Sequence, residues 1–197
     1  METAINTLPE ATTENSSAPY YQPGSSTPPQ YHPDFTAHPW ALALLKSPNV
    51  RHRRDWLRCD YSDNTDTLLR RTVAATDSFR AYAALTQYHP ETGMIENLNL
   101  ISLGTDLNAH QNLLHGGIVA TLLDEIVGAA AGLGFTAYLN VSFKKPVKTP
   151  AVVLLRSRVV KQEGRKIICA GSLEDGMGGM YASAEGMYVQ PSGKLKL

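Results

Sequence analysis

The chain has 197 residues, a length that suits one domain with at most an appendage. Its 18 basic and 18 acidic residues cancel, so the net charge gives no support for a general nucleic-acid binder. The longest apolar stretch, residues 116–135, contains two acids, which argues against a membrane span. Cys59 and Cys169 stand far apart and outside any metal-binding motif. A disulfide scaffold and a structural zinc site are therefore not expected. The sequence instead favours a protein of a reduced intracellular compartment.

The first 36 residues differ from the rest. They contain four acids and no Lys or Arg, so this segment carries −4 and the remainder +4. It is rich in Pro, Ser and Thr and shows no hydrophobic period, which predicts a disordered tail over residues 1–36. The segment resembles neither a secretory signal nor a mitochondrial leader. We therefore expect a cytoplasmic protein, with mitochondria and peroxisomes left open.

Residues 37–92 are predicted to form a helical extension. Apolar residues from Trp40 to Leu45 fit a short helix that Pro48 ends. Further apolar residues at roughly helical spacing predict one or two helices over residues 65–88. The basic run at residues 51–54 is interpreted as a solvated surface, with phosphate binding as the alternative.

The spacing of apolar residues over residues 93–190 predicts several strands and a single helix. Residues 191–197 are expected to form a tail. Strands are predicted at residues 94–103, 137–143, 151–161, 166–174 and 180–189. Short turns join the last three, which indicates an antiparallel meander. An apolar helix at residues 116–133 is expected to be buried nearly all round. The predicted class is α+β, a curved antiparallel sheet around a central helix.

Asp124 and Glu125 interrupt the apolar helix. Burying an ionised carboxylate costs several kcal/mol unless it is paired or solvated. At least one of the two is therefore expected to face a cavity, a partner or a subunit boundary. The alternative is that both point into water from a half-exposed helix.

The helix begins at His115, Gly116 and Gly117. Backbone N–H groups at a helix N-terminus can receive an anion or a developing oxyanion, and glycine lets a ligand approach closely. Nine residues, or ~13 Å, separate His115 from Asp124 along the helix axis. One substrate carbonyl group therefore cannot contact both the N-terminal amides and the Asp124 carboxylate of the same helix. A joint site requires a two-fold dimer in which one subunit gives the amides and the other the acid.

Two blocks, residues 115–125 and 136–146, resemble the hotdog-fold acyl-CoA thioesterases. They are most similar to the phenylacetyl-CoA thioesterase branch, which includes the mammalian thioesterase superfamily members. The resemblance covers residues 94–189 and implies a hotdog fold, here with additional N-terminal helices.

The resemblance also implies residue roles. Asp124 is the catalytic carboxylate, either as general base or as nucleophile. The backbone N–H of Gly116 or Gly117 holds the oxyanion, and Thr136 positions Asp124 or the water. His115 orients the loop and contacts the thioester region.

The sequence departs from the family pattern at one position, and it has a second acid, Glu125, next to Asp124. Some members place an asparagine where this chain has Ala109; Asn108 and Asn112 are nearby substitutes out of register. Asn112 is kept as a substrate-binding candidate. Glu125 is kept as well, since it could perturb or replace Asp124.

Residues 144–166 contain eight basic residues against the single acid Glu163, which suits the phosphates of CoA. The alternative is that these charges protect sheet edges from pairing. The eight are Lys144, Lys145, Lys148, Arg156, Arg158, Lys161, Arg165 and Lys166. Lys144 and Lys145 are the chosen substrate-binding candidates.

Together these features predict a thioesterase of lipid metabolism that hydrolyses acyl-CoA to a free acid and CoA. It is expected to need no metal and no redox cofactor, CoA being part of the substrate. The expected assembly is a homodimer or a dimer of dimers. Two alternatives stay open: a thioesterase releasing a polyketide or fatty acyl group from an acyl carrier protein, and a non-catalytic acyl-CoA- or protein-binding module.

Overall fold

The computed structural model describes residues 32–53, 67–69, 73 and 77–192. The helices in this part of the chain are α1 (Pro33–Thr36), α2 (Pro39–Lys46) and α3 (Gly116–Ala131). The strands are β1 (Val50–His52), β2 (Phe79–His89), β3 (Met94–Leu103), β4 (Asn108–His110), β5 (Leu113–Leu114), β6 (Phe135–Phe143), β7 (Ala151–Glu163), β8 (Lys166–Glu174) and β9 (Met180–Val189).

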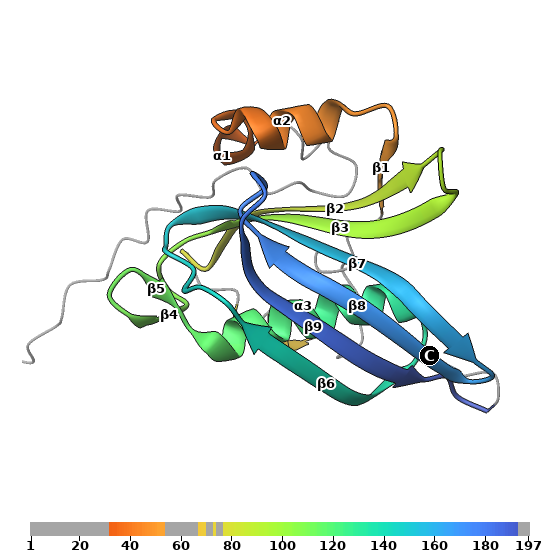
Figure 1. The fold of residues 1–197 in the computed structure, drawn as a ribbon. Helices are drawn as coiled ribbons and strands as arrows, with labels where there is room; N and C mark the ends of the chain where they lie inside the picture. Colours follow the sequence, from red (N-terminus) through yellow and green to blue (C-terminus); the bar gives the residue numbers. More distant parts are fainter. Residues whose placement is uncertain (1–31, 54–66, 70–72, 74–76, 193–197) are drawn as a thin grey trace, which may run out of the picture.

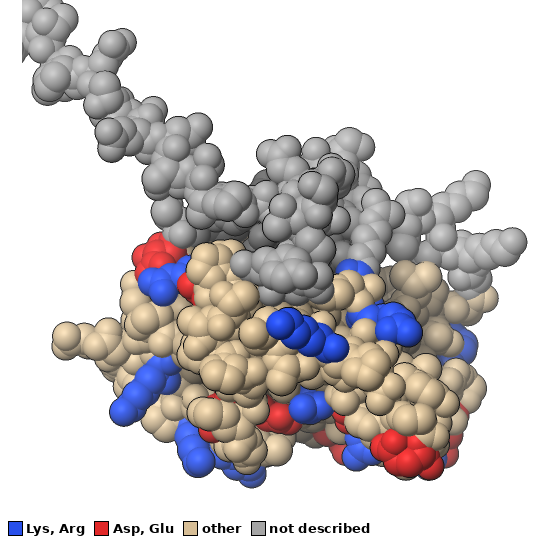
Figure 2. Space-filling model, turned by 90° about the horizontal axis from the view of Figure 1, so that it is seen from above, with Lys and Arg blue, Asp and Glu red and all other residues tan. Residues whose placement is uncertain are grey.

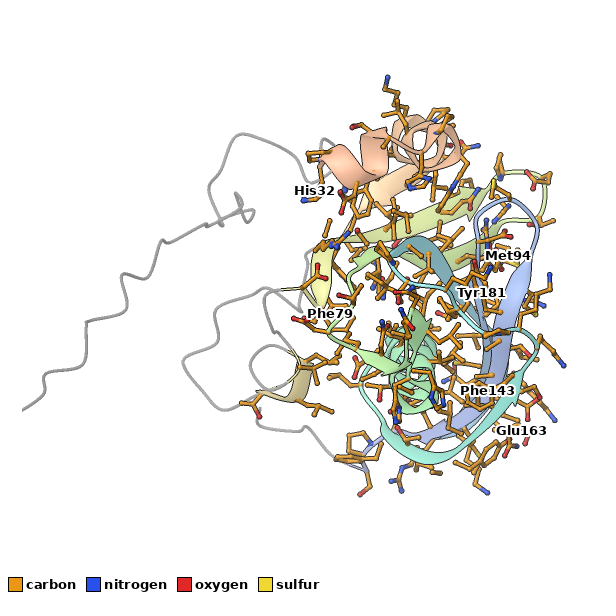
Figure 3. The ribbon with its side chains drawn as sticks, turned by 90° about the vertical axis from the view of Figure 1, so that its left-hand side faces the viewer. His32, Phe79, Met94, Phe143, Glu163 and Tyr181 are labelled. Carbon is orange, nitrogen blue, oxygen red and sulfur yellow. The ribbon has the colours of Figure 1, made fainter. Side chains whose placement is uncertain are left out.

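A seven-stranded antiparallel sheet forms the body of the molecule, in the order β1-β2-β3-β7-β8-β9-β6 (Figure 1). In the end view of Figure 3 the strands curve around α3. The short β4–β5 hairpin leads into the helix. The predicted α+β class, a curved antiparallel sheet around a central helix, is confirmed.

The main core lies between α3 and the inner face of the sheet. Leu123, Ile126 and Val127 of α3 are fully buried there against residues from β3, β7, β8 and β9. The buried residues of α3 follow one face of the helix, while Asp124, Glu125 and the residues at 128–130 are only half-buried. The expectation of burial nearly all round is therefore wrong for the single chain, because the sheet covers one side of the helix.

A second core lies on the outer face of the sheet. Helices α1 and α2 pack over β1, β2 and β3, where Phe35 is fully buried (Figure 1). The Ser102 hydroxyl of β3 donates a hydrogen bond of 2.5 Å to Oδ2 of Asp34 in α1. Residues 33–36 are thus helical, which corrects the end of the predicted disordered tail. Residues 1–31 of that tail lie outside the described residues.

The predicted helix over residues 65–88 is wrong from Phe79 onward, where β2 begins. Tyr82 and Ala84 face the main core, whereas Ala81 and Ala83 face the second core. A strand buried on both faces loses the alternation that identifies a strand. The predicted domain boundary between residues 92 and 93 falls in the β2–β3 turn, so the sheet starts before it. Residues 54–66, 70–72 and 74–76 lie outside the described part.

The basic run at residues 51–54 is solvated only in part. Arg51 and His52 are exposed on β1, as predicted. The Arg53 guanidinium donates to the backbone carbonyl of Leu85 and to the Asn99 side chain, so it ties β1 to the sheet instead of standing free in solvent. Arg54 is outside the described residues.

The remaining predicted elements are confirmed with small changes at their ends. Strands β3, β8 and β9 have the predicted bounds. Strand β6 begins two residues earlier, β7 ends two residues later, and α3 ends at Ala131, before the predicted end. Within the described ranges, no helix is both long and apolar enough to cross a membrane. Of the predicted C-terminal tail, residues 193–197 lie outside the described chain.

Replacing Phe35 by alanine tests whether α1 belongs to the folded unit. Removing a fully buried phenylalanine ring typically costs about 3 kcal/mol or more of unfolding free energy. Urea denaturation of Phe35→Ala should show this loss, while Ile95→Ala, at a side chain that is 60% exposed on β3, should stay near the parent value. Equal midpoints for the two variants would show that α1 contributes nothing to the fold.

Candidate active site

Asp124 lies on the half-exposed flank of α3, where two hydroxyl groups meet its carboxylate. The Tyr188 hydroxyl lies 2.9 Å from Asp124 Oδ1 and 3.1 Å from the Asp124 backbone carbonyl oxygen. The Thr136 hydroxyl donates to the same Oδ1 at 3.3 Å. Hydrogen-bond donors stabilise the ionised form of a carboxylate. The structure therefore brings Thr136 to Asp124, as the resemblance implied.

Thr136 reaches Asp124 because of a β-bulge. Thr136 pairs with Tyr188 and Tyr138 pairs with Met187, which leaves Ala137 as the extra residue. Without the bulge, strict alternation would place Thr136 on the opposite face from Leu139, which packs against the main core. Bulges re-aim side chains in this way and are frequent beside active sites.

Tyr188 is the residue of this site that the sequence analysis missed. It stands on the inner face of β9, where the buried side chains before it are small (Ala182, Ala184), and is 2% exposed. Burial, and after it the bond to Asp124, raises the pKa of the Tyr188 hydroxyl, which therefore stays protonated and acts as a donor. A single large polar ring ending a row of small residues is the signal that could have identified it.

The N-terminus of α3 is built around His115. The His115 Nδ1 atom accepts a hydrogen bond of 2.8 Å from the Gly117 N–H, so the imidazole caps the helix. The backbone N–H of His115 donates a hydrogen bond to the backbone carbonyl of Leu107. Within the described chain, the Gly116 N–H has no protein acceptor. Of the two candidate oxyanion donors, only Gly116 is thus available to a ligand.

The two halves of the predicted site do not meet in one chain. Eight residues along α3, or about 12 Å, separate Gly116 from Asp124. Glu125 is also half-buried, one position further on, and its side chain leaves the helix about 100° away from that of Asp124. The structure therefore gathers Asp124, Thr136 and Tyr188 at one place and His115, Gly116 and Gly117 at another.

Lys144 and Lys145 follow β6 at the end of the sheet that holds the helix N-terminus. Their backbone N–H groups both donate to the Tyr181 carbonyl, and their side chains are exposed. Phe143, just before them, lies 3.8 Å from where a Cβ on Gly116 would stand. Figure 3 shows Phe143 on the strand that passes beside α3. The chain just before both lysines thus passes beside the candidate oxyanion donor.

The eight basic residues of the 144–166 stretch do not form one surface. Arg165 and Lys166 lie by the opposite end of β6, about 26 Å away, because Lys166 and Phe135 both pair with Val189. Arg156 is paired with Glu96 and Glu174. On the face seen in Figure 2, basic and acidic side chains are interspersed. The prediction of one basic face is corrected to separate groups, since long strands carry neighbours in sequence apart.

Asn112 occupies the turn between β4 and β5. Its φ of 57° is a left-handed conformation that asparagine tolerates better than most residues, and its carbonyl accepts from the Thr149 N–H. Asn108 accepts a hydrogen bond of 2.6 Å from the Thr149 hydroxyl. Asn108 is therefore held inside the fold, while the side chain of Asn112 is exposed and stays a substrate-binding candidate.

Cys169 is fully buried in the main core, and burial raises the pKa of its thiol to about 11, which makes it a poor nucleophile. Among the residues that the structure describes, no three His, Cys, Asp or Glu side chains come together in a group that could hold a metal ion.

The antiparallel sheet wrapped around α3 defines a hotdog fold. Asp124 lies in the middle of this helix. A solved structure, zebrafish thioesterase superfamily member 2, shares the fold with a TM-score of 0.51 at 18% identity, over 66% of this chain and 88% of that chain.

Residues 111–181 match the family model of the thioesterase superfamily. The bovine acyl-coenzyme A thioesterase THEM4 is 35% identical over 89 residues, 44% of this chain and 38% of that protein. An uncharacterised mitochondrial protein of Candida albicans is 35% identical over 78 residues, 36% of this chain and 35% of that protein. The chain thus spans well under half the length of these two relatives.

Proposed function

We propose that this protein hydrolyses acyl-CoA thioesters to a free acid and CoA. The observation that carries the proposal is the Asp124 carboxylate, which two hydroxyl donors hold through one oxygen on the exposed flank of α3. The match of residues 111–181 to the thioesterase-superfamily model and the likeness to bovine THEM4 support the same reaction.

The proposed chemistry uses Asp124 and the Gly116 N–H. As a general base, Asp124 removes a proton from water while the water oxygen forms a bond to the thioester carbon. The carbonyl oxygen gains negative charge, which the Gly116 N–H and the helix N-terminus stabilise. When the carbon–sulfur bond breaks, the departing CoA sulfur takes up a proton. In the alternative route, Asp124 itself attacks the carbon, and water then hydrolyses the resulting anhydride.

We propose that the working unit is a two-fold dimer with α3 helices running in opposite directions. Strand β6 ends the sheet, and its terminal Phe135 and Phe143 are 66% and 58% exposed. The flank of α3 that carries Asp124 is also only half-buried. A second copy seated against this edge covers both features, and it brings Gly116 of one subunit towards Asp124 of the other.

The same arrangement accounts for the separated basic groups. If the two β6 strands run antiparallel, Lys144 and Lys145 of one subunit lie near the Arg165–Lys166 end of the other. The two groups then line one groove that the phosphates of CoA can occupy.

Exchanging both Lys144 and Lys145 for alanine should raise KM for acyl-CoA about tenfold and leave kcat nearly unchanged, because phosphate contacts are the same in ground and transition states. The check is steady-state kinetics on acyl-CoA beside a short thioester that lacks phosphates, whose KM should not move. Lys46→Ala, at an exposed lysine on α2, is the control. Equal KM changes for both substrates would contradict a phosphate contact.

The test of the proposed function is release of free thiol from a series of acyl-CoAs of increasing chain length. The same assay on an acylated carrier protein decides between CoA and carrier-protein thioesters. Tight acyl-CoA binding without thiol release would make the protein a binding module. We expect turnover to survive chelator treatment, since the proposed chemistry needs no metal or redox cofactor.

We propose a cytoplasmic location. The mitochondrial name of the Candida albicans relative makes mitochondria the competing location, and cell fractionation with an antibody separates the two.

A further inference from the structure

The ring of Tyr188 fits a space that glycines leave between β9 and α3. A Cβ on Gly186 would stand 2.9 Å from one ring carbon of Tyr188, and a Cβ on Gly128 would stand 3.3 Å from another. Both distances are shorter than an ordinary carbon–carbon contact of about 3.5–4.0 Å. The ring is therefore held from the helix side and from its own strand.

The Tyr188 ring, held in this way, places its hydroxyl within hydrogen-bond distance of one oxygen of Asp124. Gly128 lies one helical turn beyond Asp124, so the ring passes over the turn between them to reach Oδ1 at 2.9 Å. The Thr136 hydroxyl reaches the same oxygen at 3.3 Å. Within the described part of the chain, no hydrogen bond reaches Oδ2. The two oxygens of the carboxylate are thus placed in different surroundings.

We propose that Tyr188 is a positioning residue that fixes the Asp124 carboxylate through Oδ1 and leaves Oδ2 as the oxygen that reacts. The inference rests on the proposed thioesterase function and adds to it a residue that acts through Asp124. Carboxylates on helices change rotamer readily when exposed, so a donor on a rigid ring reduces the number of orientations that Asp124 can adopt.

The main test is Tyr188→Phe, which removes the hydroxyl and keeps the ring. We expect kcat to fall about tenfold with little change in KM. The matched control is Tyr138→Phe, since the Tyr138 hydroxyl also bonds a carboxylate, that of Glu185, at 3.1 Å and in an exposed position away from Asp124. The control should keep the parent values.

A second variant moves the ring and keeps the hydroxyl. Gly128→Ala adds a methyl group 3.3 Å from the Tyr188 ring, so the ring has to shift by a few tenths of an ångström. Alanine also stabilises a helix relative to glycine. A lower kcat in a variant whose thermal stability is not reduced would therefore trace the loss to position and not to unfolding.

A readout that needs no turnover separates this inference from the proposed function. Carboxyl-carbon NMR at one fixed pH reports the surroundings of the Asp124 carboxylate directly, and its resonance should move in Tyr188→Phe and stay in place in Tyr138→Phe. A moved resonance in a protein that hydrolyses no thioester would support the positioning role and overturn the function. Active protein with the parent resonance and the parent kcat in Tyr188→Phe would overturn the positioning role alone.

Discussion

Replacing Asp124 by asparagine should lower kcat for acyl-CoA by about 10³-fold or more, the loss typical of a removed general base. The asparagine side chain keeps an oxygen that can accept from Tyr188 and Thr136, so the local packing is retained. It cannot take a proton from water or attack a carbonyl carbon. Free-thiol release measured with a saturating substrate gives kcat, and the elution volume on a sizing column shows whether the assembly is intact.

The control for this variant is Glu185→Gln, which changes an exposed carboxylate on β9 that bonds Tyr138. It should turn over at the parent rate. If Asp124→Asn keeps full activity while Glu125→Gln loses it, the neighbouring acid performs the chemistry, and the assignment of Asp124 is wrong.

The second large effect concerns Gly116, whose N–H is the proposed oxyanion donor. Gly116→Pro removes this N–H at the first position of a helix, where proline is well tolerated. His115 already has φ −62° and ψ 131°, the extended conformation that a residue before proline prefers. Losing one such donor typically costs 10²–10³-fold in kcat, so a fall of about this size is expected. Gly116→Ala keeps the N–H, and the rate difference between the two variants measures the donor itself.

Mixed dimers of Asp124→Asn and Gly116→Pro subunits test whether the site is shared. If each site takes its acid from one subunit and its amide from the other, a mixed dimer has one intact site and one doubly defective site. The purified mixed dimer then has about half of the parent activity, and an unsorted mixture from random pairing has about a quarter. Co-expression with two different affinity tags, followed by purification through both, isolates the mixed dimer for the assay.

A site contained within one subunit gives the opposite result. Every site in the mixed dimer would then carry one defect, and its activity would stay at the level of the single variants. Recovery of activity on mixing therefore decides between the shared and the separate arrangement.

Elements that contact solvent on one side were predictable from the sequence. Strands β8 and β9 and helix α3 each show a clear period, and glycine-containing turns separate the strands, so their bounds were found within two residues. Strand β2 was not, because two cores bury its two faces and its apolar residues follow one another without alternation. A pattern read along the chain does not show that a second layer of helices covers the sheet.

The candidate site was predictable to a similar degree. Two acids within an apolar helix identified Asp124 and Glu125 as candidates, and only the resemblance to a family favoured Asp124. The glycines at the helix start identified the possible oxyanion donor. Simple alternation would have turned Thr136 outward, since the bulge at Ala137 cannot be recognised from residue types. Tyr188 stands 64 positions from Asp124, and only the pairing of β6 with β9 and the packing of α3 bring the two together.

In the part of the chain that the structure describes, the sheet separates two cores that share no buried side chain. The Asp124 cluster belongs to the inner layer, and α1 and α2 belong to the outer one. Local opening of α1 and α2 would expose the outer face of β2 and β3 but break no hydrogen bond to Asp124. Substitutions in the outer layer can therefore change the stability of the protein without changing kcat. The two properties are thus free to evolve separately.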